Sequence, residues 1–188
     1  GLDTEDKILK RISNEISNRG IIDVLRKGVD ERGIAIKLCY FEPNSSLNSD
    51  HQKLFESNQF TLIRQLYFSK ENNESIDIVL FLNGLAIITI ELKNQLSGQN
   101  IEHAQKQYRE RDPKEPLLKF NRCIAHFCVD NDKVSMTSKL DGNETSFLPY
   151  NRDLENPKVD NDYRIKYLWE DILTKSSILD IIENSACS

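Results

Sequence analysis

Three charged residues could meet at one end of a predicted β-hairpin. Asp77 opens an apolar segment, and Glu91 and Lys93 close the next apolar segment. Asn83-Gly84 joins the two segments, and this dipeptide strongly favours a tight hairpin turn. Because residues two apart on a strand share a face, Glu91 and Lys93 point the same way. The spacing therefore predicts two carboxylates and one amine close together.

This combination suits metal-assisted hydrolysis of a phosphate ester. Taking an isolated charge out of water is costly, and a divalent cation held by Asp77 and Glu91 would offset that cost. Hard oxygen ligands favour Mg²⁺ or Mn²⁺. The metal would lower the pKa of a bound water and stabilise charge on a phosphoryl oxygen. Lys93 would orient or help deprotonate that water and offset negative charge in the transition state.

The same residues have a plainer interpretation, as solvent-facing charges that pair at the surface. The register of the hairpin distinguishes the metal-site interpretation from the surface-charge interpretation. With a two-residue turn alone, Asp77 pairs with Ile90, and Glu91 faces the other side of the sheet. A shared site requires a three-residue loop or a β-bulge, which places Asp77 opposite Glu91. We predict one of these irregularities.

The elements that must position these residues are predicted from hydrophobic periodicity. Both hairpin strands are apolar on both faces, so helices should flank them in an α/β fold. Strands are predicted at 34–41, 60–68, 76–82, 85–92, 122–129 and 133–139, and helices at 3–18, 21–27, 100–111 and in the stretch 163–182. Residues 43–59, with one helical turn near Leu54, and residues 141–162 are predicted loops.

Composition limits the class of protein. The chain has 188 residues and a net charge of −5, which fits one globular domain and argues against binding nucleic acid through overall charge. Residues 103–122 reverse that sign, with six cations and three acids. The longest apolar run, 85–90, is too short for a membrane span. We expect no membrane and no signal peptide, and Gly1 is interpreted as an expression remnant.

Cysteine and histidine give no clear metal site. Cys39, Cys123, Cys128 and Cys187 form no disulfide framework, which indicates a reducing, cytoplasmic compartment. Strand alternation turns Cys123 away from His126 and Cys128, so a single zinc site is not expected and these residues should lie in the core. His51 and His103 are expected at the surface.

Asp77 with Glu91-Leu92-Lys93 resembles the PD-(D/E)xK nuclease motif, and its surroundings resemble the N-terminal nuclease region of the restriction (R) subunit of type I restriction–modification enzymes. The resemblance runs from about Gly20 to Leu168. It is carried by Ile22-Asp23-Val24-Leu25-Arg26, Arg64-Gln65-Leu66, residues 77–84 and 90–94, Gln107-Tyr108-Arg109, and residues 122–127 and 147–151.

The resemblance implies a restriction-endonuclease-like fold, with a mixed central sheet flanked by helices. It also implies Mg²⁺-dependent cleavage of double-stranded DNA, with Mn²⁺ as a substitute. Asp77, Glu91 and the backbone carbonyl of Leu92 would hold the metal, and Lys93 would be catalytic.

R subunits of this family continue into an ATP-driven motor and work with methylation and specificity subunits. No G-x-x-x-x-G-K-[ST] loop occurs in this chain, so ATP would enter only through that motor. We expect a nuclease domain at 1–162 and a helical lead-in to the motor at 163–188.

The sequence departs from related nucleases on the helix after Lys93. Where they carry Gln-x-x-x-Tyr, Ala104 stands four positions before Tyr108. Gln105 can share a face with Tyr108, and Gln107 is expected to point elsewhere. We expect Gln105, Tyr108 and Arg109 near the scissile phosphate, and the choice of glutamine stays open. A solvated amphipathic helix is the alternative. Two further alternatives for the whole chain are a stand-alone nuclease and a catalytically silent scaffold that binds DNA or partner subunits.

Overall fold

The computed structural model describes residues 2–43, 49–69 and 72–185. The expectations for Gly1, for 44–48 and for Cys187 lie outside the described residues. The helices are α1 (Leu2–Arg19), α2 (Ile21–Lys27), α3 (Ser49–Glu56), α4 (Ile101–Glu110) and α5 (Lys175–Asn184), with short helical turns η1 (Gln95–Ser97) and η2 (Leu168–Ile172). The strands are β1 (Val29–Glu31), β2 (Ile34–Ile36), β3 (Phe60–Tyr67), β4 (Ser75–Leu82), β5 (Leu85–Leu92), β6 (Ala125–Val129), β7 (Val134–Thr137) and β8 (Leu148–Pro149).

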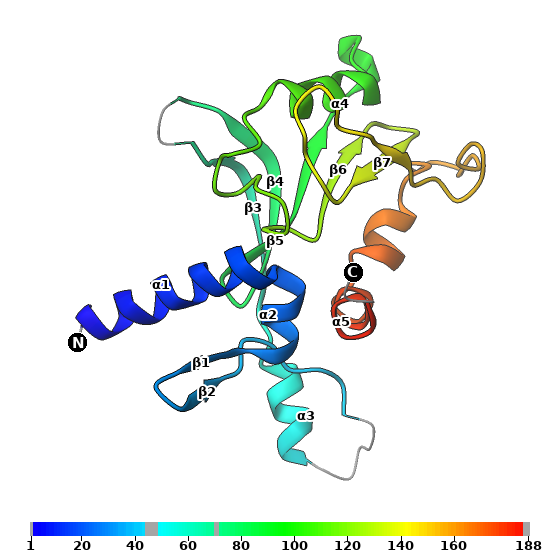
Figure 1. Cartoon of the computed structure of the whole chain (residues 1–188). Helices are drawn as coiled ribbons and strands as arrows, with labels where there is room; N and C mark the ends of the chain where they lie inside the picture. Colours follow the sequence, from blue (N-terminus) through cyan, green and yellow to red (C-terminus); the bar gives the residue numbers. More distant parts are fainter. Residues whose placement is uncertain (1, 44–48, 70–71, 186–188) are drawn as a thin grey trace.

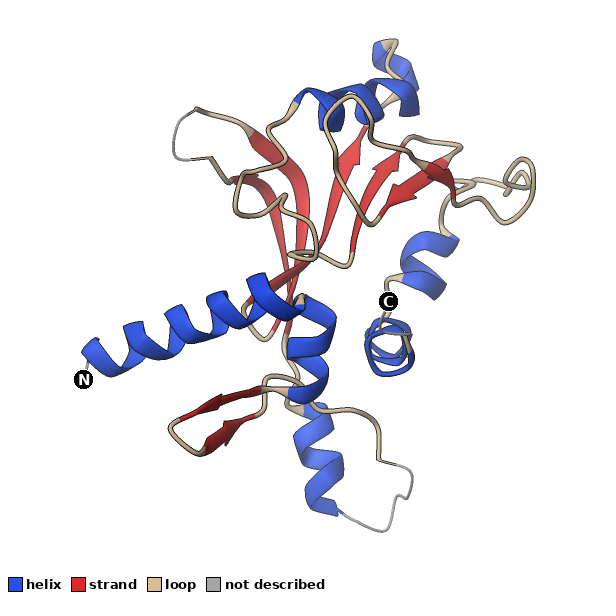
Figure 2. Ribbon diagram, in the orientation of Figure 1, coloured by secondary structure: helices blue, strands red, loops and turns tan. Residues whose placement is uncertain are grey.

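A six-stranded mixed sheet in the order β3-β4-β5-β6-β7-β8 forms the centre of the molecule. Strands β5 and β6 run parallel, and all other neighbours run antiparallel. Helices surround this sheet, and β1 and β2 form a separate small hairpin (Figure 2). The predicted α/β class with a mixed, helix-flanked sheet is therefore confirmed.

The hairpin β4–β5 contains the predicted bulge. Asn83 and Gly84 have φ angles of 49° and 82°, which a tight two-residue hairpin turn requires. Phe81 pairs with Ala86, whereas Leu80 pairs with Ile88, so Ile87 is the extra residue. Beyond the bulge Ile78 pairs with Ile90, and the same register places Asp77 opposite Glu91.

Two apolar clusters cover the two faces of the sheet. Tyr108 and Ala104 of α4 join the smaller cluster, together with Ile76 and Val79 of β4. The larger cluster contains residues of α1, α2 and α5, packed against the inward residues of β5 and β6. In Figure 1, α4 lies at the top of the view and α1 and α2 lie below the sheet. The sheet thus separates α4, which carries the residues expected near the scissile phosphate, from the N-terminal helices.

Residues 163–184 belong to this core. Ile165, Tyr167 and Leu168 are buried in the larger cluster, and so are Ile178, Leu179 and Ile182 of α5. The predicted helical character of this stretch is confirmed. Its packing joins it to the sheet, because within the described residues the same apolar cluster continues across position 162.

Several boundaries differ from the predictions. The helix α3 has eight residues where one turn was expected, and strand β2 ends at Ile36 rather than at residue 41. Cys39, Cys123 and Cys128 are buried and free, and the core positions predicted for Cys123 and Cys128 are confirmed. In residues 2–43, 49–69 and 72–185, every helix falls short of the length or apolarity that a bilayer span requires.

Two glycines provide a test of this backbone. Gly28 and Gly84 both have positive φ angles, of 74° and 82°. A Cβ at Gly28 would lie 2.3 Å from the carbonyl oxygen of Ile36, whereas a Cβ at Gly84 would meet no described heavy atom within 4 Å. We expect Gly84→Ala to lower the free energy of unfolding by about 1 kcal/mol, through backbone strain alone. Gly28→Ala should cost about 3 kcal/mol, because the clash adds to the strain. Urea denaturation measures both, and equal losses would contradict the close approach at Gly28.

Candidate active site

Asp77 and Glu91 face each other at the end of the hairpin. Asp77 Oδ2 accepts a hydrogen bond of 2.8 Å from the backbone N–H of Leu92. This bond ties the start of β4 to the last residue of β5. The carboxylates of Asp77 and Glu91 also interact with each other, which raises the pKa of Glu91. The structure therefore brings together the two carboxylates that the sequence singles out.

Glu91 is completely buried, with an exposed fraction of 0%. Burial raises its pKa to about 7, mainly through loss of hydration, while the charge of Arg111 opposes the shift. Arg111 Nη1 lies 2.5 Å from Glu91 Oε1. Within the described residues, however, neither Glu91 oxygen makes a hydrogen bond of ordinary geometry, and neither does Arg111 Nη1. Arg111 therefore engages Oε1 of Glu91 as an ion pair, while Oε2 has no hydrogen bond of ordinary geometry in the described part of the chain.

Arg111 is a site residue that sequence reasoning missed. Its Nη2 donates a 2.6 Å hydrogen bond to the carbonyl oxygen of Ser75 at the start of β4. The guanidinium lies 5.4 Å from the ring centroid of Phe68 and 5.3 Å from that of Tyr108. The available signal was the buried acid itself, because a fully buried carboxylate needs a nearby cation.

Lys93 is positioned by the helix α4. Its Nζ donates a 2.6 Å hydrogen bond to Gln107 Oε1, and its backbone N–H donates to the carbonyl oxygen of Val129. The expectation that Gln107 points elsewhere is wrong. The face of a helix fixes the direction of Cβ, but the longer side chain of Gln107 still reaches the end of β5.

The other predicted residues of α4 have different surroundings. Gln105 Nε2 donates to Ser135 Oγ at 2.9 Å. Arg109 Nε donates to the carbonyl oxygen of Thr145, and its guanidinium lies over the ring of Phe147. Tyr108 is 1% exposed, and its hydroxyl lies 2.8 Å from Thr89 Oγ1. Tyr108 therefore supports the strand from inside, where solvent and DNA do not reach it.

A buried polar chain lies beneath Glu91. Thr89 Oγ1 contacts Tyr108 Oη at 2.8 Å and His126 Nδ1 at 2.6 Å. Burial lowers the pKa of His126 to about 4, and the charge of Arg111 adds to this shift. His126 is thus a neutral core residue at pH 7, as the sequence predicts. His51 and His103 are exposed, also as predicted.

The strand β3 carries unusual backbone opposite Asp77. Gln65 has a φ of 50°, and it lies between the pairs Arg64–Ile78 and Leu66–Ile76. A left-handed conformation costs about 1–2 kcal/mol for a residue with a Cβ. Such strain is concentrated at functional sites in many proteins, and here it lies directly beside a candidate metal ligand.

The donor set fits a hard divalent cation. Among the described residues, no cluster of three or more His, Cys, Asp or Glu side chains could hold a metal ion. Two carboxylates, Asp77 and Glu91, are present, with the exposed end of β5 at Leu92 beside them. Oε2 of Glu91 is the atom that fits a cation, because buried carboxylate oxygens are normally satisfied and this one makes no hydrogen bond of ordinary geometry among the described residues.

Several of the cations in residues 103–122 are engaged by other groups of the chain. Arg111 is buried against Glu91, and Lys106 pairs with Glu110 on the surface. Arg109 is held against the loop that contains Thr145. Part of the positive charge in the segment 103–122 is therefore used in contacts within the chain.

The pair Glu91–Arg111 should dominate local stability. We expect Arg111→Met to lower the free energy of unfolding by about 3–5 kcal/mol, because Glu91 would remain buried without a cation. The double variant with Glu91→Leu should recover most of this loss. Lys106→Met, which removes an exposed ion pair, should change stability by less than about 0.5 kcal/mol. Chemical denaturation compares the three, and equal effects of Arg111→Met and Lys106→Met would contradict the assignment.

His126 should make stability depend on pH. Its pKa is about 4 in the folded chain and 6.5 in the reference state, so between these values the unfolded chain binds a proton that the folded chain does not. The contribution of His126 to stability is therefore complete above about pH 6.5 and falls as pH decreases toward 4, by on the order of 3 kcal/mol. Glu91, whose pKa is raised from 4.5 to about 7, contributes with the opposite sign over much of the same range. His126→Gln should remove this contribution, so that in urea denaturation the variant becomes more stable relative to the wild type as pH falls from 6.5 to 4.5. An unchanged slope would contradict the neutral, buried imidazole.

Comparisons with known proteins show the family of the chain. The family model described as "Type I restriction enzyme R protein N terminus (HSDR_N)" matches residues 3–145. A protein of Methanocaldococcus jannaschii, assigned as the type I restriction enzyme MjaVIIIP endonuclease subunit, is 26% identical over 187 residues. The alignment covers 95% of this chain and 17% of that relative, so the chain spans about one sixth of its length. Since the family model covers most of the sequence, the chain belongs to the family of type I restriction enzyme R protein N-terminal regions.

Proposed function

We propose that this chain is an Mg²⁺-dependent endonuclease domain that hydrolyses phosphodiester bonds of double-stranded DNA. The observation that carries the proposal is the pairing of Asp77 with a fully buried Glu91 next to Lys93; Oε1 of Glu91 contacts Arg111, and its Oε2 makes no hydrogen bond of ordinary geometry among the described residues. Family membership and the name of the archaeal relative support a nuclease role. Methylation and specificity subunits, and coupling to ATP-driven translocation, would involve the rest of an R protein.

The residues have separate roles in this proposal. Asp77, Glu91 and the carbonyl oxygen of Leu92 would hold the cation, which would supply Lewis acidity toward the phosphate and the attacking water when bound. Arg111 keeps the Glu91 carboxylate in place through a 2.5 Å contact. The hydrogen bond from the backbone N–H of Leu92 to Asp77 Oδ2 fixes the strand end.

Lys93 would orient the attacking water and offset negative charge that develops on the phosphate. Gln107 holds the Lys93 ammonium group through the 2.6 Å hydrogen bond and restricts its position. We therefore assign to Gln107 the role of the glutamine on α4. Gln105 and Arg109 are bound to Ser135 and Thr145 through one nitrogen each, which restricts their positions but leaves further donors on both side chains.

Metal binding is tested by calorimetric titration with Mn²⁺. We expect the wild type to bind Mn²⁺ and Asp77→Ala to lose that binding, because one of two carboxylate ligands is removed. Asp141→Ala, which removes an exposed acid paired with Lys139, serves as the control and should bind normally. The titration is repeated with a short DNA duplex, because a DNA phosphate can complete the ligand set. Absence of binding in both titrations would favour a catalytically silent scaffold.

Lys93 separates metal binding from cleavage. We expect Lys93→Met to keep Mn²⁺ binding and to lower the rate of plasmid cleavage by roughly 100-fold or more, because the ammonium acts in the transition state. Gln107→Leu should lower the cleavage rate less, since the Gln107 side chain only restricts the position of Lys93. If Lys93→Met cuts DNA at the wild-type rate, the catalytic role of Lys93 is wrong.

A further inference from the structure

A cavity of about 310 Å³ lies at the ends of the parallel strands β5 and β6. Its wall includes Leu92 and Lys93, so it is continuous with the strand end that carries the candidate metal site. By strand alternation, the side chain of Leu92 lies on the face opposite Glu91. The cavity and the carboxylates thus occupy the two sides of one strand end.

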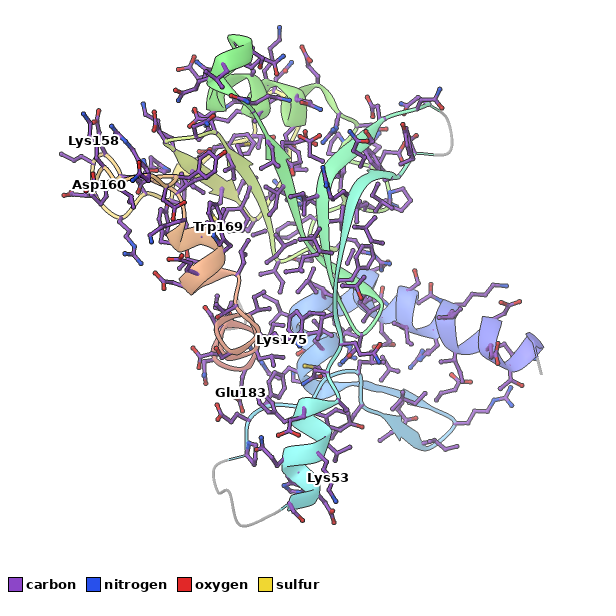
Figure 3. All side chains as sticks on the ribbon, turned by 180° about the vertical axis from the view of Figure 1, so that it is seen from behind. Lys53, Lys158, Asp160, Trp169, Lys175 and Glu183 are labelled. Carbon is purple, nitrogen blue, oxygen red and sulfur yellow. The ribbon has the colours of Figure 1, made fainter. Side chains whose placement is uncertain are left out.

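Two aromatic rings form the outer wall of this cavity. Tyr163 is 54% exposed and Trp169 is 47% exposed, although both are large apolar side chains. Their ring centroids are 6.3 Å apart, and the ring planes are inclined by 75°. Figure 3 shows Trp169 on the side of η2 that faces the sheet. A flat heterocycle can stack on one ring and meet the edge of the other.

Two carboxamides complete the wall with hydrogen-bond donors. Asn94 Oδ1 accepts from the backbone N–H of Leu96, and Asn131 Oδ1 accepts from that of Gln95. These bonds fix both side chains through their oxygens. In the part of the chain that the structure describes, neither Nδ2 has a hydrogen-bond partner. The edges of all four bases carry acceptor oxygen or nitrogen atoms that such donors can bind.

We propose that this cavity binds one unstacked nucleobase of the DNA strand that is cut. The inference rests on the proposed function, because it is the position of the cavity beside Leu92 and Lys93 that places a base near the scissile phosphate. The aromatic pair supplies stacking. The asparagine amides donate hydrogen bonds, and every base carries acceptor atoms that can receive them. The site therefore favours DNA that is unpaired or easily opened next to the cut.

Trp169 is the only tryptophan in the sequence, so its fluorescence reports on this cavity directly. The full 188-residue chain is titrated, without divalent metal, with a labelled duplex that carries one unpaired thymine. The comparison duplex has an abasic site at the same position. We expect quenching of Trp169 that depends on the base, and tighter binding of the thymine duplex by label anisotropy.

Tyr163→Ala should weaken binding of the thymine duplex by about tenfold and leave binding of the abasic duplex unchanged. Tyr67→Ala is the matched control, because Tyr67 is 68% exposed on β3 and lies outside the cavity. It should bind both duplexes as the wild type does. A weaker thymine preference in Tyr67→Ala than in Tyr163→Ala would overturn the assignment.

Equal quenching and equal affinity for the two duplexes would also overturn the inference. So would a change in Trp169 emission with protein concentration in the absence of DNA, because a second copy would then fill the cavity. The proposed function fails separately. Base-dependent quenching by a chain that neither binds Mn²⁺ nor cuts DNA supports the cavity and contradicts the nuclease. Cleavage of DNA without base-dependent quenching supports the nuclease and contradicts the proposed base-binding cavity.

Discussion

The removal of one carboxylate from water determines the structure around the candidate site. Glu91 is fully buried at the end of β5, so a cation must lie close to it. Arg111 supplies that cation from the residue that ends α4. The guanidinium is in turn held by the carbonyl oxygen of Ser75 and by the rings of Phe68 and Tyr108. One buried charge thus ties the start of β4, the end of β5 and the end of α4 into a single unit.

The position of α4 follows from the same constraint. Asn100 begins the helix with a capping box that involves His103, and the pair Arg111–Glu91 fixes its other end. Between these points Tyr108 enters the core and contacts Thr89. With the helix held at both ends and in the middle, Gln107 lies where it can reach Lys93. The amine is therefore positioned by contacts that do not themselves involve DNA or metal.

Local sequence signals predicted much of this arrangement. Asn83-Gly84 and the two apolar strands indicated the hairpin, and the need to bring Asp77 and Glu91 together indicated a bulge, which occurs at Ile87. Arg111 could not be recognised in the same way, because its partner is distant in sequence and its burial depends on tertiary packing. The core role of residues 163–184 was hidden for a similar reason. Helical periodicity shows that a segment has an apolar face, but not which surface covers that face.

Because of the bulge at Ile87, the arrangement of the candidate site depends on the number of residues in the hairpin as well as on their types. Side chains alternate between the two faces of a strand, so parity along β5 decides which face Glu91 and Lys93 occupy. The loss or gain of one residue between Leu80 and Glu91 would exchange the two faces, even if every charged residue were retained. Two such changes would cancel. Among proteins built on this hairpin, the length of the segment is as informative as its composition, and an intact motif with the wrong parity would be a scaffold rather than an enzyme.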